Sequence, residues 1–154
     1  MTTSTTPDLA FLLAHASHVL STELTAALAG LGITPRANCV LTSALPGDRT
    51  QIQLADVCQL DKTTMVVTVD ELEKAGLVER RTSSTDRRAR IIVVTDRGRE
   101  VHARARDVVA DVYQDVLGAL PADERSGFVS SLTRLVEDRL STPVACRRAP
   151  RRRT

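Results

Sequence analysis

The 154-residue chain contains no tryptophan, and aromatic residues make up only 2% of it. Surfaces that bind single-stranded nucleic acid stack bases on aromatic side chains, so this composition argues against that class of protein. The cysteines Cys39, Cys58 and Cys146 are odd in number and widely spaced. We therefore expect reduced thiols rather than a disulfide framework or a structural zinc site.

Long apolar runs are also missing. No stretch of eighteen apolar residues occurs, which excludes a conventional transmembrane helix. No basic residue precedes the first apolar segment, so the sequence does not begin like a secretory signal peptide. We expect a cytoplasmic protein without a membrane partner.

Signatures of catalysis are absent as well. The sequence contains no phosphate-binding loop, dinucleotide fingerprint, nucleophile elbow or HExxH zinc motif. A thiol peroxidase would need an activated cysteine with a partner group, and no such pair is evident. We expect a protein that is not an enzyme and that carries no cofactor or bound metal.

Positive charge is concentrated in two places, although the formal net charge is only +2. Five arginines lie between Arg80 and Arg90 against a single acid, Asp86. A second group forms the basic tail at 141–154, which we expect to be disordered. Local basic clusters on a near-neutral body predict contact with a polyanion at defined points.

The first predicted helix, residues 9–29, has few charges on any face. Apolar residues recur at three- and four-residue steps, and Asp8 and Glu23 are the only charged residues among the first 35. An ordinary surface helix carries charges on its outer side. We expect one face to lie on the core and the other against a second subunit or a ligand cavity. The alternative is the central helix of a monomer.

The middle of the chain contains the helix start and stop signals that are typical of a helix-turn-helix. Helix starts are predicted by hydroxyl or carboxylate caps, and breaks by glycine and proline. The signals are Thr34-Pro35, the break at Pro46-Gly47, the capping box from Thr50 to Gln53, the cap Asp61 and the stop at Gly76. The short helix after Thr50, with Ile52, Leu54, Ala55 and Val57 as its apolar residues, is joined to helix 62–75 by a tight connection.

A β-hairpin and two further helices are predicted after the helix-turn-helix. Residues 77–82 and 87–95 are expected to be strands joined by the turn-forming residues 83–86. Thr95 is expected to cap a long helix from 96 to 117, and Pro121 to open a last helix at 122–140.

The helix at 62–75 can be divided into faces at 100° per residue. Its expected core positions are Met65, Thr68, Val69 and Leu72. The N-terminal half of a recognition helix reaches base edges, so the candidate readers are Lys62, Thr63, Thr64 and Val67, with Val66 at the flank. An outward Val67 could contact a thymine methyl, or it could pack on a neighbouring loop.

The hairpin is the second candidate DNA contact. Arginines suit narrow minor grooves, and the tip carries Arg87, Arg88 and Arg90. On the preceding strand, Arg80 and Arg81 are expected to pair with Asp86 and to touch phosphates. The alternative is an ordinary charged β-turn, but the position directly after a helix-turn-helix favours a wing.

The order and spacing of these segments resemble the MarR family of winged helix-turn-helix regulators over roughly residues 9–140. The most specific part combines Leu-Glu-x-Ala-Gly-Leu-Val with Asp-x-Arg. The segments that carry it are Leu31–Arg36, Gln53–Val57, Asp61–Thr64, Val69–Arg80, Asp86–Arg90 and Thr95–Gly98. The chain departs from the family pattern at Val66, Val67 and Glu71.

The resemblance implies a mainly α (α+β) fold, with one domain over 1–140. The winged helix-turn-helix would occupy about 34–95, and helices at about 8–30 and 96–140 would form a homodimer. It also implies a ligand-responsive repressor that binds a pseudo-palindromic operator in double-stranded DNA. The wing motif of the family falls on Asp86 and Arg88.

The resemblance further implies a small-molecule effector between the first, second and fifth helices. His15, His18 and His102 are the candidate effector residues; they could bind a phenol or carboxylate, or zinc, or could be interface histidines without a ligand. The family's oxidant sensors carry a cysteine in the first helix, and this chain has none there. Cys39 and Cys58 are expected to be buried fillers. The alternative function is a helical protein-interaction or metal-sensing module that binds DNA weakly.

Overall fold

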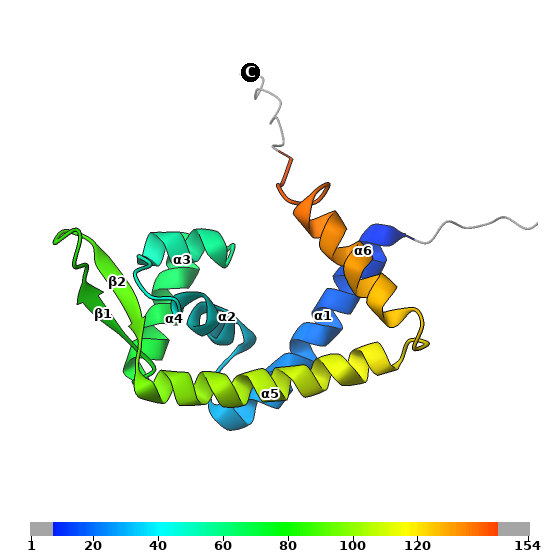
Figure 1. Ribbon diagram of the computed structural model, residues 1–154, viewed down its shortest axis with the longest axis horizontal. Helices are drawn as coiled ribbons and strands as arrows, with labels where there is room; N and C mark the ends of the chain where they lie inside the picture. The colour runs from blue at the N-terminus through cyan, green and yellow to red at the C-terminus, as the bar shows by residue number, and fades with distance from the viewer. Residues whose placement is uncertain (1–7, 145–154) are drawn as a thin grey trace, which may run out of the picture. The chain divides into compact units, whose positions relative to one another are not determined.

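The computed structural model describes residues 8–144, which form a mainly helical fold with one two-stranded sheet (Figure 1). Residues 145–154 of the predicted tail, including Cys146, lie outside this part. The chain divides into two compact units within its longest helix, between Tyr113 and Gln114. The elements are α1 (Leu9–Leu28), the 3-10 helix η1 (Ala29–Leu31), α2 (Pro35–Ala44), α3 (Gln51–Val57), α4 (Lys62–Lys74), β1 (Val78–Thr82), β2 (Arg90–Val94), α5 (Asp96–Gly118) and α6 (Arg125–Glu137).

The predicted caps set the helix starts of the helix-turn-helix. Thr34 Oγ1 accepts a hydrogen bond from the backbone N–H of Ala37 at 3.1 Å. Thr50 and Gln53 form the reciprocal capping box. Asp61 Oδ1 accepts from Thr64 N at 2.9 Å. Each cap satisfies N–H groups that have no partner within the helix, so three short helices begin where the sequence predicts.

The core of the first unit lies where α2, α3, α4 and β2 converge. The inward face of α4 is the predicted one, with Met65, Thr68, Val69 and Leu72 all buried. Thr68, the one polar member, donates its hydroxyl proton to Thr64 O at 2.8 Å, which removes most of the cost of burying it. The largest fully buried side chains are Leu28, Leu41, Leu54, Met65, Ile92, Val40, Val69 and Val78.

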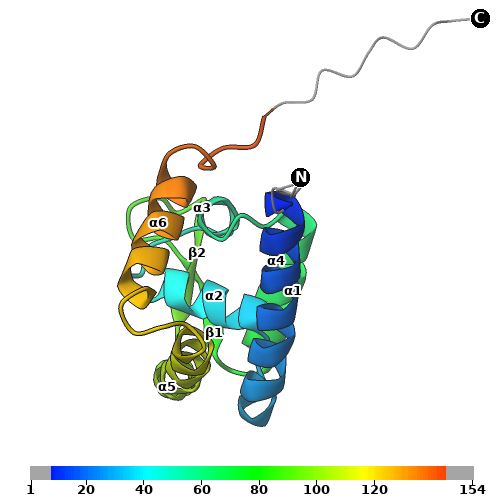
Figure 2. The ribbon, with the colours of Figure 1, turned by 90° about the vertical axis from the view of Figure 1, so that its right-hand side faces the viewer.

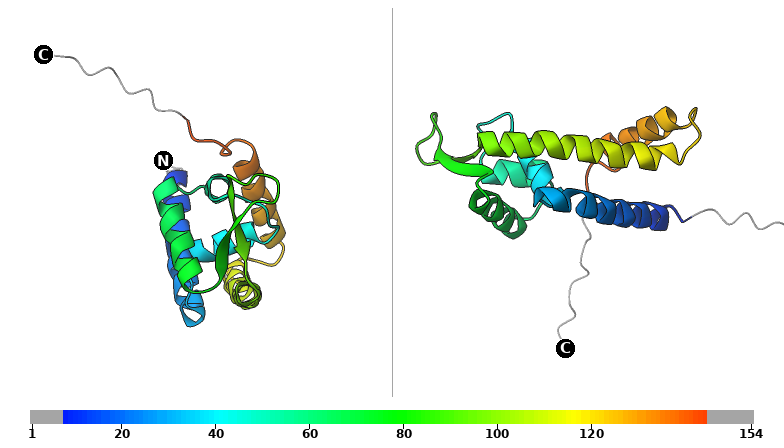
Figure 3. Two further views of the ribbon diagram at one scale, coloured as in Figure 1. Left: turned by 90° about the vertical axis from the view of Figure 1, so that its left-hand side faces the viewer. Right: turned by 90° about the horizontal axis from the view of Figure 1, so that it is seen from below.

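The hairpin pairs β1 with β2 in antiparallel register, from Val78 opposite Val94 to Thr82 opposite Arg90. An isolated antiparallel bridge joins Thr50, just before α3, to Ile91 of β2. The loop extends to residue 89, so Arg87 and Arg88 lie in the loop and the predicted start of the second strand at 87 is wrong. The two strands project beyond α4 and carry this loop at their free end (Figure 3).

The start of α5 is tied closely to the hairpin. Thr95 Oγ1 accepts from Gly98 N at 3.0 Å and donates to Gly76 O at 2.7 Å. Thr95 N donates to Leu77 O at 3.0 Å. Gly76 has φ +73°, a backbone conformation that favours glycine, and so ends α4 sharply enough for this contact.

The first helix was predicted to bury one face in the core, but most of its residues are exposed. Leu28 is its only buried residue, whereas Leu9 and Leu13, which have the spacing expected of the core face, are 61% and 38% exposed. The expected core face is therefore wrong for the N-terminal part of α1 within a single chain. Among residues 8–144 no single helix is long and apolar enough to cross a membrane; one pair, Leu9–Leu31 with Pro35–Ala44, meets the criteria jointly but is bent by 73°.

The last helix is shorter than the predicted 122–140. Residues 122–124 form a turn in which Glu124 N donates to Pro121 O at 3.0 Å. The guanidinium of Arg125 donates to Leu120 O at 3.0 Å and to Gly118 O at 3.2 Å, which satisfies carbonyls at the end of α5. Like α1, α6 leaves apolar side chains such as Phe128 and Val136 exposed.

Candidate nucleic-acid interface and ligand pocket

The N-terminal half of α4 presents the predicted outward residues to solvent. Lys62, Thr63, Val66 and Val67 are exposed, and Val67 keeps 49% of its surface accessible. Thr64 is different because its hydroxyl donates to Asp61 Oδ2 at 2.5 Å. The Val67 side chain is therefore accessible to a partner, as a contact with a thymine methyl would require.

The Asp61 carboxylate is held in its charged form by the helix that it caps. Hydrogen bonds from the Thr64 hydroxyl and then from the Thr64 backbone N–H lower the pKa of Asp61 below its ordinary value. Because the pKa is lower in the folded state, the Asp61 carboxylate stabilises the fold fully at pH values above its unfolded-state pKa. This contribution is lost as the pH falls through the folded-state pKa.

We expect Asp61→Asn to flatten the acid limb of the unfolding profile. Asparagine keeps the cap but cannot lose a carboxylate charge, so the stability difference between wild type and variant should shrink as the pH drops below about 4. Urea unfolding followed by circular dichroism between pH 3 and 7 measures this difference. A constant difference across that range would contradict the assignment, and Asp56→Asn on the exposed side of α3 is the matched control.

An apolar hollow lies beside the recognition helix, and sequence reasoning missed it. It has a volume of about 180 Å³ between α3 and α4 and is lined by Gln51, Ile52, Ala55, Lys62, Met65 and Val66. Of the four apolar residues of α3, Leu54 and Ala55 are buried, whereas Ile52 is 63% exposed and Val57 is 53% exposed. With Val66 and Val67, Ile52 gives the surface next to the basic wing an apolar character.

Two side chains order the tip of the hairpin. Ser83 Oγ accepts from the backbone N–H groups of Thr85 and Asp86, at 3.2 and 3.3 Å. Asp86 Oδ1 accepts from Arg88 N at 2.9 Å. These short-range turns leave Arg87, Arg88 and Arg90 exposed, and in residues 8–144 none of the three forms an ion pair. Ser83 was not among the predicted site residues.

Arg80 and Arg81 do not pair with Asp86, so that prediction is wrong. The Arg80 guanidinium instead donates to carboxylates of Asp70 and Glu73 on α4 and to Gln51 Oε1 on α3 at 3.2 Å. Partial burial opposes the charge, but these hydrogen bonds raise the pKa of Arg80 above its ordinary value. Arg81 pairs with Glu79 of its own strand.

The three candidate histidines lie in different surroundings. His15 and His18 are exposed on α1, where His15 stacks on Phe11 with ring centroids 5.6 Å apart. His102 Nε2 lies 3.1 Å from Thr42 Oγ1 of α2, and burial together with the charge of Arg106 lowers the pKa of His102. In the described residues no group of three metal-ligating side chains is formed.

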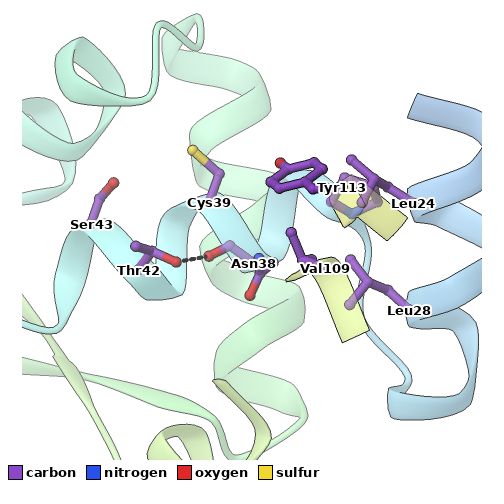
Figure 4. A pocket seen from close by; sticks show the side chains of 9 residues that line it. Leu24, Leu28, Asn38, Cys39, Thr42, Ser43, Val109 and Tyr113 are labelled. Carbon is purple, nitrogen blue, oxygen red and sulfur yellow. Dashed lines mark hydrogen bonds between the residues drawn. The ribbon is translucent and has the colours of Figure 1, made fainter. Parts of the chain in front are cut away.

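A pocket of about 280 Å³ lies between α1, α2 and the part of α5 that belongs to the first unit (Figure 4). Figure 2 shows the ribbons of these helices. Apolar residues of α1 and α5 form one side, and polar residues of α2 form the other. The lining residues are Leu24, Leu28, Pro35, Asn38, Cys39, Thr42, Ser43, Val109 and Tyr113.

The polar wall of the pocket has one unsatisfied group. Asn38 Oδ1 is buried and has no hydrogen-bond partner in the described residues. Cys39 is exposed there rather than a buried filler, and partial burial and then the neighbouring Cys58 raise its pKa. The Cys58 thiol donates to Ser43 Oγ at 3.4 Å. Sequence periodicity could not find this wall, because it depends on how three helices meet.

Comparison with known proteins places this geometry in a family. A model of the MarR family matches residues 40–89. The fold matches CouR bound to a 23-mer DNA duplex, with 30% identity over 83% of this chain and 92% of the other and a TM-score of 0.74. CouR from Rhodococcus jostii bound to p-coumaroyl-CoA is 26% identical over 90% and 96%, also with a TM-score of 0.74.

A MarR family protein of Mycobacterium tuberculosis in complex with p-aminosalicylic acid is 30% identical to this chain. The match covers 82% of this chain and 97% of the other, with a TM-score of 0.70. The sequence identity over most of both chains and the winged helix-turn-helix fold support the same assignment. The chain therefore belongs to the MarR family of transcriptional regulators.

Proposed function

We propose that this chain is a homodimeric, ligand-responsive repressor that binds a pseudo-palindromic operator in double-stranded DNA. The observation that carries the proposal is an ordered wing whose three exposed arginines lie in the same unit as an exposed recognition helix. The related CouR has been solved with a DNA duplex. A basic wing beside such a helix can contact adjacent grooves of one duplex.

Each predicted DNA contact has a separate role in this proposal. Lys62, Thr63, Thr64 and Val67 face the major groove, with Thr64 restricted by its bond to Asp61. Arg87, Arg88 and Arg90 enter the minor groove, while Asp86 shapes their turn. Arg81 contacts phosphate. Arg80 acts as a positioning residue, because its bonds to α3 and α4 hold the wing against the helix-turn-helix.

The exposed apolar surfaces support a homodimer. α1 and α6 leave apolar residues uncovered, and Phe11 and Phe128 are each more than half exposed. Large apolar patches on a regulator mark sites of protein association. We propose that residues 1–140 work as one MarR-like domain, with helices at about 8–30 and 96–140 in the dimer interface. His15 and His18 then lie at or near that interface.

The effector site in this proposal is the pocket between α1, α2 and α5. Relatives have been solved with p-coumaroyl-CoA and p-aminosalicylic acid. His102 contributes through its contact with Thr42 on the polar wall. A small organic effector suits this pocket better than zinc, since the described residues provide no three-ligand group.

A continuous set of hydrogen bonds can couple this pocket to the wing. Ser43 lines the pocket, and its carbonyl accepts from Arg49 Nη1 at 2.6 Å. The carbonyl of Arg49 accepts from Ile92 N in β2 at 2.9 Å. A ligand that displaces α2 would therefore disturb the wing. It would shift the equilibrium between the original and the displaced conformation only by the difference between its affinities for the two.

Selection from a randomised duplex pool tests the proposed function. We expect a two-fold symmetric site, two chains per duplex in sedimentation, and affinity that falls steeply with salt because phosphate contacts release counterions. An asymmetric or unselective pool, or a lone chain at micromolar concentration, would contradict the proposal. Dimers that select no duplex would favour the alternative of a protein-interaction module.

A further inference from the structure

We propose that the hollow between α3 and α4 binds the 5-methyl group of a pyrimidine base in each operator half-site, and that Ile52 and Val66 determine this preference. The inference rests on the proposed function, in which α4 enters the major groove of DNA. It adds the chemical group that the operator must present there, and it adds Ile52, a residue of α3, to the DNA contacts.

The hollow is apolar in its buried part and at its rim. Its volume is about 180 Å³. Ala55 and Met65 are the buried members of its lining, whereas Ile52 and Val66 are 63% and 41% exposed. Isoleucine and valine are branched at Cβ and occupy few rotamers, so this surface is formed before a partner arrives and loses little entropy when one binds. The hollow therefore suits a small apolar group that its partner presents rigidly.

Positive charge around the hollow indicates that the partner is a DNA duplex. Lys62 lines the hollow and lies one helical turn before Val66, so the cation and the apolar rim share a face of α4. Within residues 8–144 neither Lys62 nor the wing residues Arg87, Arg88 and Arg90 form an ion pair. Duplex DNA offers phosphates to such cations and a methyl group in its major groove to the hollow, so one partner satisfies both.

Side chains that could hydrogen-bond to a base are scarce at the hollow. Among the described residues that line it, Gln51 is the one uncharged polar side chain, and its Oε1 accepts from Arg80 Nη2 at 3.2 Å. The hydroxyl of Thr64, the next candidate on α4, donates to Asp61 Oδ2. An aliphatic side chain cannot hydrogen-bond to a base edge, and among the four bases only thymine places a methyl group in the major groove. Because 5-methylcytosine carries its methyl group at the same ring position, we expect the hollow to accept either base.

Base analogues in the duplex selected from the randomised pool test this inference. Deoxyuridine in place of thymidine removes the methyl group and nothing else. We expect one thymine per half-site at which this change weakens binding of the full-length protein about fourfold, and roughly tenfold or more when both half-sites are changed. At the same position, a pair of guanine with 5-methylcytosine should bind more tightly than a pair of guanine with cytosine by the same factors. Fluorescence anisotropy at one fixed salt concentration measures all four duplexes.

Two substitutions assign the methyl preference to the hollow. Val66→Thr keeps the shape of the side chain but replaces a methyl group by a hydroxyl, and Ile52→Ala removes most of the rim that α3 contributes. In each variant the thymine and uracil duplexes should bind within about twofold of each other at the sensitive position. Val57→Ala is the matched control and should keep the wild-type preference, because Val57 is 53% exposed on α3 but does not line the hollow.

Three results would overturn the inference. Uracil could bind as well as thymine at every position, or cytosine as well as 5-methylcytosine at the sensitive one. Ile52→Ala and Val66→Thr could both keep the wild-type preference for the methyl group. A methyl-sensitive thymine that responds to Val67→Ala alone would assign the contact to Val67 and remove the hollow from base recognition.

Failure of the proposed function gives a different result. If a symmetric duplex is selected and bound with steep salt dependence but its methyl groups do not matter, the regulator stands and only the inference is wrong. If the pool yields no selected duplex, the proposed function is wrong and the inference falls with it.

Discussion

Replacing Arg88 with alanine is expected to weaken operator binding by at least about thirtyfold. An arginine in a groove contributes about 1–3 kcal/mol to the free energy of DNA binding. The proposed dimer carries two wings, so the substitution removes this contribution twice. Arg88 is exposed, forms no ion pair in residues 8–144, and is presented by the bond from its own N–H to Asp86 Oδ1. Removing the side chain should therefore cost little folding stability.

Fluorescence anisotropy on the selected duplex at several salt concentrations measures this effect. The variant should lose two cations per dimer, and the slope of log affinity against log salt should become shallower by about two. Arg104→Ala is the matched control, since Arg104 is an exposed arginine on α5 outside the wing. An Arg88→Ala variant that binds as well as wild type, with the same salt slope, would remove the wing from the DNA interface.

We expect Gly98→Ala to be the most destabilising of the small substitutions in this chain. A Cβ at residue 98 would lie 2.0 Å from Leu77 O and 2.8 Å from Val94 Cγ1. The Leu77 carbonyl cannot yield easily, because it also accepts from Thr95 N at the start of α5. Overpacking together with the loss of a buried hydrogen bond should lower the free energy of unfolding by about 2–4 kcal/mol.

Urea unfolding monitored by circular dichroism tests this prediction. Gly118→Ala is the control on the same helix. Apart from the adjacent backbone of α5, no atom of residues 8–144 lies within 4 Å of its added Cβ, so its unfolding midpoint should stay near that of wild type. If Gly98→Ala shared the midpoint of Gly118→Ala, the close contact between α5 and the hairpin would be wrong. The site matters for function because this contact joins the wing to α5.

Local interactions explain why much of the winged helix could be predicted. The caps Thr34, Thr50 and Asp61 each bond to a residue three positions ahead, so the sequence alone contains both partners. The buried face of α4 follows from helical geometry, and Met65, Thr68, Val69 and Leu72 are buried as predicted. The resemblance to the MarR family was confirmed by the matches in sequence and fold.

Predictions that depended on distant residues were less reliable. Asp86 was expected to hold Arg80, but Arg80 contacts Gln51, Asp70 and Glu73, which come from other elements. No spacing rule in the sequence separates these partners from Asp86. The last helix was predicted too long because Pro121 opens a turn first and the helix begins at Arg125.

Residue order alone predicted the succession of helices and hairpin and the side of α4 that faces outward, because capping and periodicity act over a few residues. It also predicted the family, through motifs that the later comparisons confirmed. The folded chain was needed to show that Arg80 braces the wing, that the N-terminal part of α1 is exposed, and that Asn38 holds a buried oxygen without a partner in the described residues. These features arise where segments far apart in the chain come together, and such encounters are selected by packing of the whole core rather than by any local pattern.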